Sequence, residues 1–569
     1  MAGPVFVHIG PEGPADTALA QLFRANGHAV ACHEGGRLAA DVHFAMGQGQ
    51  QPLAAWPDVR LFAGLYRHQP HWRPPLDAWR CAAFLRDWLP QARFVLIIPP
   101  QDRWPLWRAR TGALACHVAR HGLPPAALPG LWQRQLATHL EAMRTLFRDD
   151  PRLLVVDTDL DSPADLAARL DAVLPMQVLP FDNWPVLEAP DVIDLLTRPD
   201  PPSAPAGWAA DVARFCLQGL DPAAKGSLAG LSPLACRWDG SLRGRGAVTD
   251  PQGNPRQFTL LSPSEGPPLA LARDGRHFKL IRAEGVINDI LSLNRRDPVW
   301  IDMEDSRWFG SPQGEALDRP VLCHNRREGA VNAVLWPLPD QHAIGLPGFD
   351  PAAAPDTVPF EDKEDRLIWR GMISGSEMRD GVKPGPAAHV WLKRLAEASD
   401  APARRAAWQG LCRTNRLAFV RRFFGHPDFD LGVVMAPAFR SLADDPLLAP
   451  FCTVRAGHDL FRRFRYQLYL TGYDHGSNFM TALDSRSVLL AEQDGWQVFY
   501  SNRFKPWQHF IPIARHAVDI EEKLAWARAH PAECKAMSQA ARQEAAFLRD
   551  PAARRDVMRL ILDGLAAAR

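Results

Sequence analysis

Three motifs in the last third of the chain carry residues that could bind an anion. They are WRGMISGSEMRD (Trp369 to Asp380), RFRYQLYLTGYDHGSNF (Arg463 to Phe479) and FKPWQHFIPI (Phe504 to Ile513). An apolar strand that opens into a loop of glycine, serine and arginine presents backbone N–H groups, hydroxyls and a guanidinium on one surface, as a diphosphate requires. Because the three motifs follow one another at helical intervals, we predict a diphosphate site in this part of the chain.

A cluster of carboxylates lies further upstream, in PVWIDMEDSRWFG. Asp302, Glu304 and Asp305 follow an apolar strand, and a carboxylate in such a position can act as a general base toward a hydroxyl group. By the alternation of side chains along a strand, Met303 and Asp305 share one face, and Asp302 and Glu304 share the other. Only one face can serve a cleft. Capping or solvation is the alternative role for each carboxylate, and Glu328 is the next candidate base.

Residues 290 to 550 resemble the family-90 glycosyltransferases, which include protein O-glucosyltransferases and bacterial capsule and lipopolysaccharide modifiers. The order of the motifs carries the resemblance: the acidic strand, Trp-Arg-Gly, the Gly-Ser loop, and the closing PWQHFIPI. It implies inverting transfer of glucose or xylose from a UDP-sugar to an acceptor hydroxyl, with no metal and no cofactor. It also implies a GT-B type pair of Rossmann-like α/β domains with a cleft between them.

The resemblance assigns roles to individual residues. It places the catalytic base at Asp305 and a sugar- or ribose-binding carboxylate at Glu492. Asn478 stands where relatives have an arginine, and His475 or Arg465 could offset the missing charge. A buried Arg–Asp pair is the alternative for Arg379, and core packing is the alternative for the aromatic residues of the closing motif. The residues expected to bind the donor are Arg370, Gly371, Ser374, Ser376, Arg379, Arg465, Gly476, Ser477, Asn478, Phe479, Glu492 and His509.

The first 170 residues resemble sulfotransferases. VFVHIGPEGPADTALAQLF is similar to their phosphosulfate-binding strand, loop and helix, and RFVLIIPPQDRWPLWRAR and LLVVDTDLDSPADLAARL are similar to two later strands. Pro11 stands at the phosphate-binding lysine, Pro14 and Ala15 at the threonine pair, and Pro99 and Pro100 at an Arg-Asp pair. Proline offers neither a charge nor an N–H group. We therefore predict a domain without sulfotransferase activity, which serves in docking or as a scaffold.

The elements that must position these motifs fall into three predicted domains. Residues 1–197 form a sulfotransferase-like α/β domain, residues 208–355 an acceptor-side domain of short strands, and residues 356–569 the nucleotide-sugar-binding domain. The strands expected in the middle domain are FTLLS, FKLIR, PVWIDM, PVLCHN and AVLWPL, and the Pro-rich linker RPDPPSAPAG precedes them.

Composition narrows the class of partner. The chain has 569 residues, 47% of them hydrophobic, and its net charge of +1 gives no overall field that would favour nucleic acid. Its nine cysteines include no CxxC pair, so neither a zinc site nor a disulfide framework is expected. MAGPVFVHIG lacks a basic leader, and no window of eighteen residues is uncharged and apolar. These features predict a cytoplasmic protein, and peripheral contact with the inner membrane stays open.

The expected partners are a UDP-sugar and a bacterial surface glycan acceptor, such as a lipopolysaccharide or capsule precursor. A catalytically silent scaffold protein in glycan assembly is the alternative function. Asp305, Arg370 and Arg379 favour the enzyme.

Overall fold

The computed structural model describes residues 4–68, 75–110, 113–185, 196, 202–228, 231, 233–237, 259–261, 278–339, 354–375 and 385–569. Contacts divide the chain into two compact units. Unit 1 comprises residues 1–200, 230–301 and 338–345, and unit 2 comprises residues 201–229, 302–337 and 346–569. Each unit contains a parallel sheet with helices beside it, so the predicted α/β class is confirmed. The three-domain division, the GT-B pairing and the sulfotransferase-like character of the first domain stay predictions.

Unit 1 is built on five parallel strands in the order β2-β3-β1-β6-β7. Its elements are β1 (Phe6–His8), α1 (Pro14–Ala25), β2 (Val30–Cys32), α2 (Arg37–Gln48), β3 (Leu61–Ala63), β4 (Tyr66–Arg67), β5 (Leu76–Asp77), α3 (Ala82–Trp88), β6 (Arg93–Ile98), α4 (Trp104–Arg110), α5 (Ala113–His121), α6 (Leu128–Leu146), β7 (Leu153–Asp157), α7 (Pro163–Asp171), β8 (Leu234–Arg237), β9 (Thr259–Leu261), α10 (Phe278–Ser292) and β10 (Val299–Asp302). The apolar runs predicted as buried strands form β1, β6 and β7.

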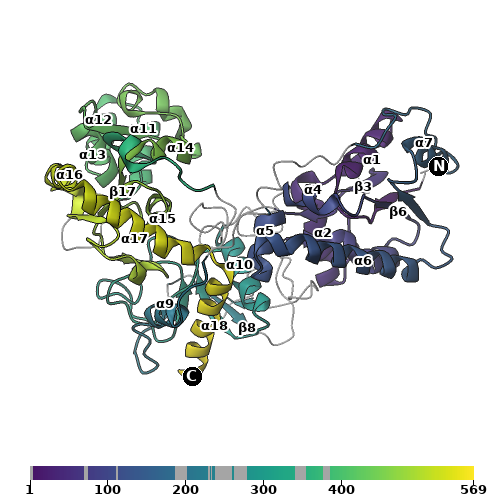
Figure 1. The fold of residues 1–569 in the computed structure, drawn as a ribbon, viewed down its shortest axis with the longest axis horizontal. Helices are drawn as coiled ribbons and strands as arrows, with labels where there is room; N and C mark the ends of the chain where they lie inside the picture. Colours follow the sequence, from purple (N-terminus) through teal and green to yellow (C-terminus); the bar gives the residue numbers. More distant parts are fainter. Residues whose placement is uncertain are drawn as a thin grey trace. The chain divides into compact units, whose positions relative to one another are not determined.

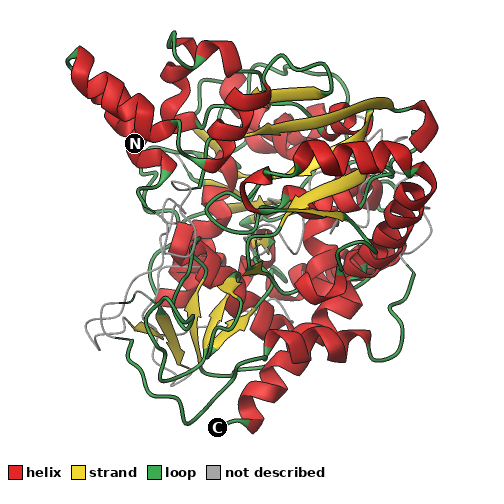
Figure 2. Cartoon of the chain, turned by 90° about the vertical axis from the view of Figure 1, so that its left-hand side faces the viewer, coloured by secondary structure: helices red, strands yellow, loops and turns green. Residues whose placement is uncertain are grey.

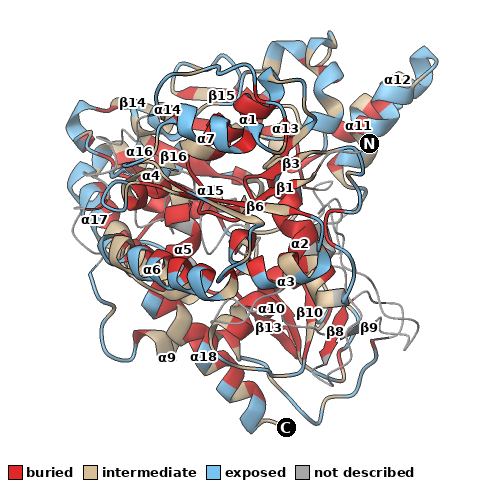
Figure 3. Ribbon diagram, turned by 90° about the vertical axis from the view of Figure 1, so that its right-hand side faces the viewer, coloured by how far each residue is buried: buried red, intermediate tan, exposed pale blue. Residues whose placement is uncertain are grey.

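Helices cover both faces of this sheet. α1 and α7 pack on one face, where Phe23 and Leu166 join the core formed by Phe6 and Val95. α2 and α6 lie on the other face (Figure 1). Figure 3 shows that buried and exposed positions alternate along α6, one of these covering helices. This pattern is that of an amphipathic helix whose apolar stripe covers a sheet.

One predicted strand is wrong. FKLIR was expected to form a strand, but the structure has it as the start of α10. The apolar residues that follow, Val286, Ile287, Ile290 and Leu291, are spaced for one helical face and are buried. A five-residue apolar run does not distinguish a strand from a buried helix, so the longer period decides. The other four expected strands are present. FTLLS contains β9 and PVWIDM contains β10 in unit 1, and PVLCHN contains β11 and AVLWPL contains β13 in unit 2.

Unit 2 is built on the parallel sheet β15-β14-β16-β17-β19, with helices on either side of its strands (Figure 2). Its elements are α9 (Trp208–Cys216), β11 (Val321–Cys323), β12 (Arg326–Arg327), β13 (Ala333–Leu335), β14 (Glu364–Gly371), α11 (Ala388–Glu397), α12 (Ala401–Leu411), α13 (Asn415–Phe423), β15 (Phe429–Val433), α14 (His458–Arg462), β16 (Phe464–Tyr469), α15 (Asn478–Leu483), β17 (Val488–Glu492), β18 (Trp496–Gln497), β19 (Ile511–Ile513), α16 (Ile520–Ala529), α17 (Pro531–Arg549) and α18 (Pro551–Ala567). If the five strands of this sheet are numbered in chain order, they lie side by side in the order 2-1-3-4-5.

That strand order places the expected ligand site. In a doubly wound sheet, ligands bind at the carboxyl ends of the strands, at the point where the strand order reverses. In unit 2 this point lies between β14 and β16, whose carboxyl ends are Gly371 and Tyr469. Among the described helices, none has the length and low charge needed to cross a bilayer.

Candidate functional site

The loops that follow β14 and β16 touch at two glycines. Gly375 has a φ of +92°, and a Cβ there would lie 2.9 Å from the carbonyl oxygen of Gly472. A Cβ at Gly472 would lie 2.7 Å from Ser374 Oγ and 2.8 Å from Arg416 Nη2. A side chain at Gly375 is opposed by this backbone contact and by the positive φ, whereas a side chain at Gly472 would displace the side chains of Ser374 and Arg416. Glycine at both positions therefore lets the two loops approach each other closely at the switch point.

Arg416, near the start of α13, holds these loops together. Its Nη2 donates to Leu470 O at 2.8 Å, and its Nη1 donates to Ser374 Oγ at 2.6 Å and to Met372 O at 3.2 Å. Burial lowers the pKa of the guanidinium, which nevertheless stays charged because the ordinary value is so high. Arg416 lies 42 residues from Ser374 and 54 from Leu470, so no local motif marks it.

Several predicted donor-binding residues lie at this carboxyl edge. Ser374 is buried beside Arg416, Gly476 donates its N–H to Tyr469 Oη at 3.1 Å, and Ser477 precedes α15. Asn478 is the exposed first residue of that six-residue helix. Phe479 instead packs into an aromatic cluster with Tyr469, His475, Phe504 and Phe510, with ring centroids 4.8–6.2 Å away. The structure thus gives Phe479 the core role.

Glu492 lies at the carboxyl end of β17 and ties three segments together. Its Oε2 accepts from Asn415 Nδ2 at 2.7 Å and from Thr471 N at 2.9 Å, and its Oε1 accepts from His516 N at 2.7 Å. It is buried, so it fixes the loop after β16 rather than facing solvent. Two residues later, burial raises the pKa of Asp494 to about 6, although Thr471 Oγ1 and Trp496 N both donate to this carboxylate.

Other predicted residues lie elsewhere. Arg370 forms an ion pair with Asp430 of the neighbouring strand β15. Arg465 lies near the amino end of β16, the opposite end from the switch point, where it donates to Glu361 O at 2.9 Å. We therefore leave Arg465 out of the site, because a side chain there faces the wrong edge of the sheet. His509 lines a separate groove. Ser376 and Arg379 lie outside the described residues.

Asp305 lies in the turn after β10 and not on the strand itself, which ends at Asp302. Ser306 has a φ of +57° and fastens this turn to the loop after β16, because its Oγ donates to Tyr473 O at 2.6 Å and its N–H donates to Asp474 Oδ2 at 3.2 Å. The Asp305 side chain is 51% exposed. A solvent-accessible carboxylate is thereby held against the loop that borders the switch point.

The two competing carboxylates share one counter-ion. Arg307 Nε donates to Asp302 Oδ1 at 2.8 Å, and Arg307 Nη2 pairs with Glu304. Asp302 is buried, and Glu304 and Asp302 contact the same guanidinium, as expected for residues on one side of the chain. Met303 is buried whereas Asp305 is half exposed, so the expected sharing of a face by these two does not hold beyond the end of the strand.

His324, which follows β11, faces Asp305. Its Nε2 lies 3.8 Å from Asp305 Oδ1 and 3.5 Å from Asp474 Oδ2, and the ring is buried. Ligand atoms of these three residues lie within 4.8 Å of one another, close enough to hold a cation. No local motif indicates this group, since its members come from three separate segments.

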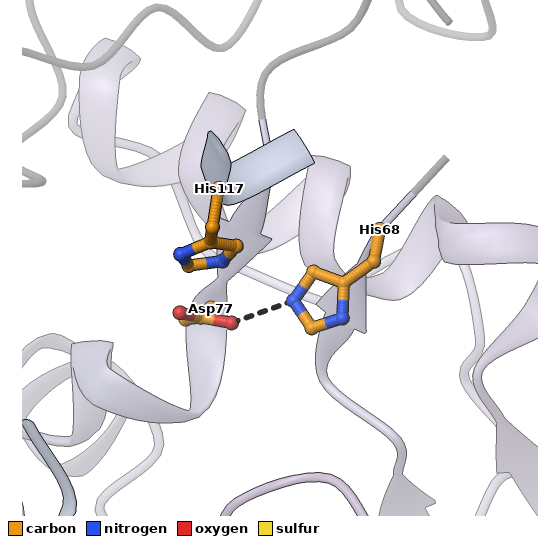
Figure 4. Close-up of side chains that lie close together, drawn as sticks. All are labelled: His68, Asp77 and His117. Atoms are coloured by element: carbon orange, nitrogen blue, oxygen red, sulfur yellow. Dashed lines mark hydrogen bonds and ion pairs between the residues drawn. The ribbon is translucent and has the colours of Figure 1, made fainter. Parts of the chain in front are cut away.

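Unit 1 holds a second cluster at the carboxyl edge of its sheet. Figure 4 shows His68, Asp77 and His117 turned toward one another, with His68 Nε2 2.8 Å from Asp77 Oδ1. A cation already fills the cluster: Arg108 Nη2 lies 2.8 Å from both Asp77 oxygens, 3.3 Å from His117 Nε2 and 3.5 Å from His68 Nε2. Glu12, from the loop after β1, lies 2.9 Å from Arg108 Nε.

The electrostatics of this cluster are those of a closed internal network. Burial raises the pKa of Glu12 and lowers that of His117. Burial alone would also raise the pKa of Asp77, but the charge of Arg108 and the contact with His68 hold it well below its ordinary value. The guanidinium occupies the position that a metal ion would take between these ligands. The cluster therefore needs no external cation.

The sheet of unit 2 is thus a doubly wound α/β sheet whose switch point is bordered by glycine-containing loops and by the loop to which the Asp305 turn is fastened. Comparison with known proteins narrows this class. Residues 457–559, which include β16, α15, β17 and β19, match the model of glycosyl transferase family 90. The family whose model matches this part of the chain is the one that its motifs predict.

Similar proteins carry related names. The chain is 26% identical over 221 residues to Protein O-glucosyltransferase 2 of Danio rerio, covering 37% of the chain and 42% of that protein. It is 24% identical over 275 residues to O-glucosyltransferase LpsA of Dichelobacter nodosus, covering 47% of the chain and 67% of that protein. A shorter match of 83 residues, 29% identical, links it to Uncharacterized protein 035R of Invertebrate iridescent virus 3 and spans 14% of the chain and 8% of that protein. The matches to the zebrafish and viral proteins thus span less than half of their lengths.

Proposed function

We propose that the protein is an inverting, metal-independent glycosyltransferase that moves a sugar from a UDP-sugar to a hydroxyl group of a glycan. The observation that carries the proposal is the Asp305 carboxylate, accessible to solvent and fastened through Ser306 to the loop at the β14/β16 switch point. A base and an anion site are thereby held on adjacent segments. Glucose is the first candidate sugar, because two relatives are named O-glucosyltransferases. Xylose is the second.

In this proposal the leaving UDP binds at the switch point. Arg416 places its charge behind the loops after β14 and β16, and the small residues Ser374, Gly375, Gly472 and Gly476 let their backbones come close to a phosphate. A fixed cation stabilises the negative charge that develops on the β-phosphate as the bond to the sugar breaks. Arg416 thus joins Arg370 and Arg379, arginines expected to bind the donor, as a candidate for this role, and Arg370 is paired with Asp430.

Asp305 acts as the general base. It accepts the proton of the acceptor hydroxyl while that oxygen forms a bond to the anomeric carbon, and the bond from this carbon to the β-phosphate oxygen breaks on the opposite face. UDP leaves, and the configuration inverts. His324 and Asp474 face the Asp305 carboxylate and fix its environment. A group in position for proton transfer contributes about 10²- to 10⁴-fold to rate.

Asp494 is the alternative base, because its pKa of about 6 lies near a working pH. Its carboxylate, however, accepts hydrogen bonds from Thr471 and Trp496, whereas Asp305 is accessible to solvent. The geometry therefore favours Asp305. A bacterial lipopolysaccharide or capsule precursor is the proposed acceptor, reached from the cytoplasm with peripheral contact at the inner membrane.

The test is donor turnover and binding in EDTA. Wild-type protein is expected to bind UDP by calorimetry and to hydrolyse UDP-glucose slowly without acceptor. Asp305→Asn should bind UDP normally but lose about two to four orders of magnitude in turnover. Glu315→Gln, an exposed carboxylate in the same segment, is the matched control and should behave as wild type. A strict need for Mn²⁺ or Mg²⁺ would refute metal independence, and a protein that neither binds nor hydrolyses UDP-sugars would be the silent scaffold.

A further inference from the structure

Unit 2 contains a groove of about 970 Å³ to which neither the proposed base nor the switch-point loops contribute. Its walls come from α9, the segment 502–509, α17 and α18. The lining residues are Ala210, Asp211, Ala213, Arg214, Phe215, Leu217, Gln218, Asn502, Arg503, Lys505, Gln508, His509, Glu544 and Leu560. A pocket of this size with mixed polar and apolar walls is typical of a ligand site.

The charges in the groove neutralise one another. Arg503 binds Glu544 through two contacts, Nε to Oε1 at 2.6 Å and Nη2 to Oε2 at 3.2 Å. Arg214 pairs with Asp211 at 2.8 Å, and Arg503 Nη1 lies 3.9 Å from the same carboxylate group. Two cations thus meet two anions, and Lys505 remains as an exposed ammonium group at the rim. A diphosphate needs several uncompensated cations, so the groove is better suited to a neutral ligand.

His509 supplies a hydrogen-bond donor with a fixed tautomer. The backbone N–H of Lys505 donates to His509 Nδ1 at 2.8 Å, so Nδ1 carries no proton. Burial lowers the pKa of this imidazole, which keeps the ring neutral, and its single proton therefore resides on Nε2. The ring is buried in the wall of the groove. His509 is thus a neutral N–H donor in the wall of this groove.

Asn502 supplies an acceptor. Its Nδ2 donates to Asp211 O at 3.4 Å, whereas its Oδ1 is shielded from solvent and has no hydrogen-bond partner among the described residues. A buried polar atom without a hydrogen-bond partner destabilises the fold, and a ligand hydroxyl that reached Oδ1 would supply the missing partner. The amides of Gln218 and Gln508 add further donors and acceptors to the lining.

We propose that this groove binds a neutral oligosaccharide, the glycan portion of the acceptor. A sugar ring presents hydroxyl groups, each able to donate and accept, together with apolar C–H faces. The groove offers the matching set: planar amides, paired carboxylates and guanidinium groups, one imidazole N–H, and the apolar side chains of Ala213, Leu217 and Leu560. This inference rests on the proposed function and adds the substrate class and its binding site.

The groove is tied to a segment that faces the base. Arg326 of β12 donates through Nη2 to Phe215 O at 2.7 Å and through Nη1 to Gln218 O at 2.9 Å, and both of these residues line the groove. Arg326 follows His324, which faces Asp305, by two residues. The segment from His324 to Arg326 therefore contacts both the groove wall and the base.

The probe is a glycan array of neutral and acidic bacterial oligosaccharides, read with the full-length protein, and each hit is titrated by calorimetry. Neutral glycans should bind. Asn502→Leu and Gln508→Ala should each weaken that binding at least tenfold and leave UDP binding unchanged. Gln508 is exposed, so its variant tests the site without a folding risk. Gln313→Ala, an exposed glutamine outside the lining, is the control.

Three results would overturn the inference. The protein could bind no neutral glycan, both variants could bind glycan as tightly as wild type, or the variants could lose UDP binding while they keep glycan binding. UDP titration of the same samples separates this failure from failure of the proposed transferase. Glycan binding without UDP binding would support the proposed glycan groove and refute the proposed UDP-sugar transferase. UDP binding without glycan binding would support the transferase and refute the glycan groove.

Discussion

Replacing Arg108 by methionine should severely destabilise unit 1. The guanidinium is fully buried, lies 2.9 Å from Glu12 Oε1 and 2.8 Å from both Asp77 oxygens, and has the rings of Trp104 and Trp132 at 5.1 and 5.3 Å. Methionine retains part of the volume but leaves two buried carboxylates without their cation. Removing one partner of a buried ion pair costs about 3–5 kcal/mol. The free energy of unfolding of a domain is about 5–15 kcal/mol, so this substitution should remove a large part of the stability of unit 1.

The assay is calorimetric unfolding of the full chain between pH 4 and pH 8. In the wild type the folded pKa of Asp77 lies below its ordinary value of 3.8, so its stabilising contribution is full above that value and is lost only as the pH falls through the folded pKa. Without Arg108, burial dominates and both carboxylates prefer the protonated form. The deficit of Arg108→Met relative to wild type should therefore be larger at pH 7 than at pH 4.

The control is Arg103→Met, since the Arg103 side chain is 60% exposed and lies 4.0 Å from Asp102. It should change stability by less than about 0.5 kcal/mol. A second arm uses Zn²⁺. Wild-type protein should gain no stability from it, because Arg108 fills the cluster, whereas Arg108→Ala frees His68, Asp77 and His117 and should regain part of its lost stability. The reasoning is refuted if Arg108→Met unfolds as wild type does, or if wild-type protein binds Zn²⁺ at these residues.

Two further predictions concern unit 2. Arg416→Lys keeps a positive charge but cannot bridge the loops after β14 and β16. UDP affinity, measured by calorimetry, should therefore fall about tenfold to a hundredfold, as for loss of a charged hydrogen bond worth about 1.5–3 kcal/mol. Arg405→Lys, at an exposed position, is the control. The folded pKa of Asp494 is raised from 3.8 to about 6, so its contribution to stability is full below pH 3.8 and is lost as the pH rises through 6. Asp494→Asn lacks this loss, and its unfolding temperature should rise relative to wild type between pH 4 and pH 7; a constant difference would contradict the assigned burial.

Local chemistry was readable in the sequence. The apolar runs before Gly371 and Gly472 predicted parallel strands opening into tight loops, and a Cβ at Gly472 would lie within 3.0 Å of side chains of the neighbouring segments. The order of motifs indicated the transferase family, whereas the loss of phosphate binding inferred from Pro11 stays a prediction. The alternation rule failed just past Asp302, because it applies only while the chain stays extended.

The partners of each charge were decided by tertiary structure. Arg370 and Arg416 are both arginines near apolar segments, but only the fold shows that the first pairs with Asp430 while the second reaches two loops more than forty residues away. Likewise His324 meets Asp305 because separate segments converge, and Arg108 of α4 fills its cluster because the fold brings it to Asp77, 31 residues away in the chain. Sequence fixes which groups are present and how the local chain turns, whereas electrostatic roles depend on distances across the fold, which no local pattern encodes.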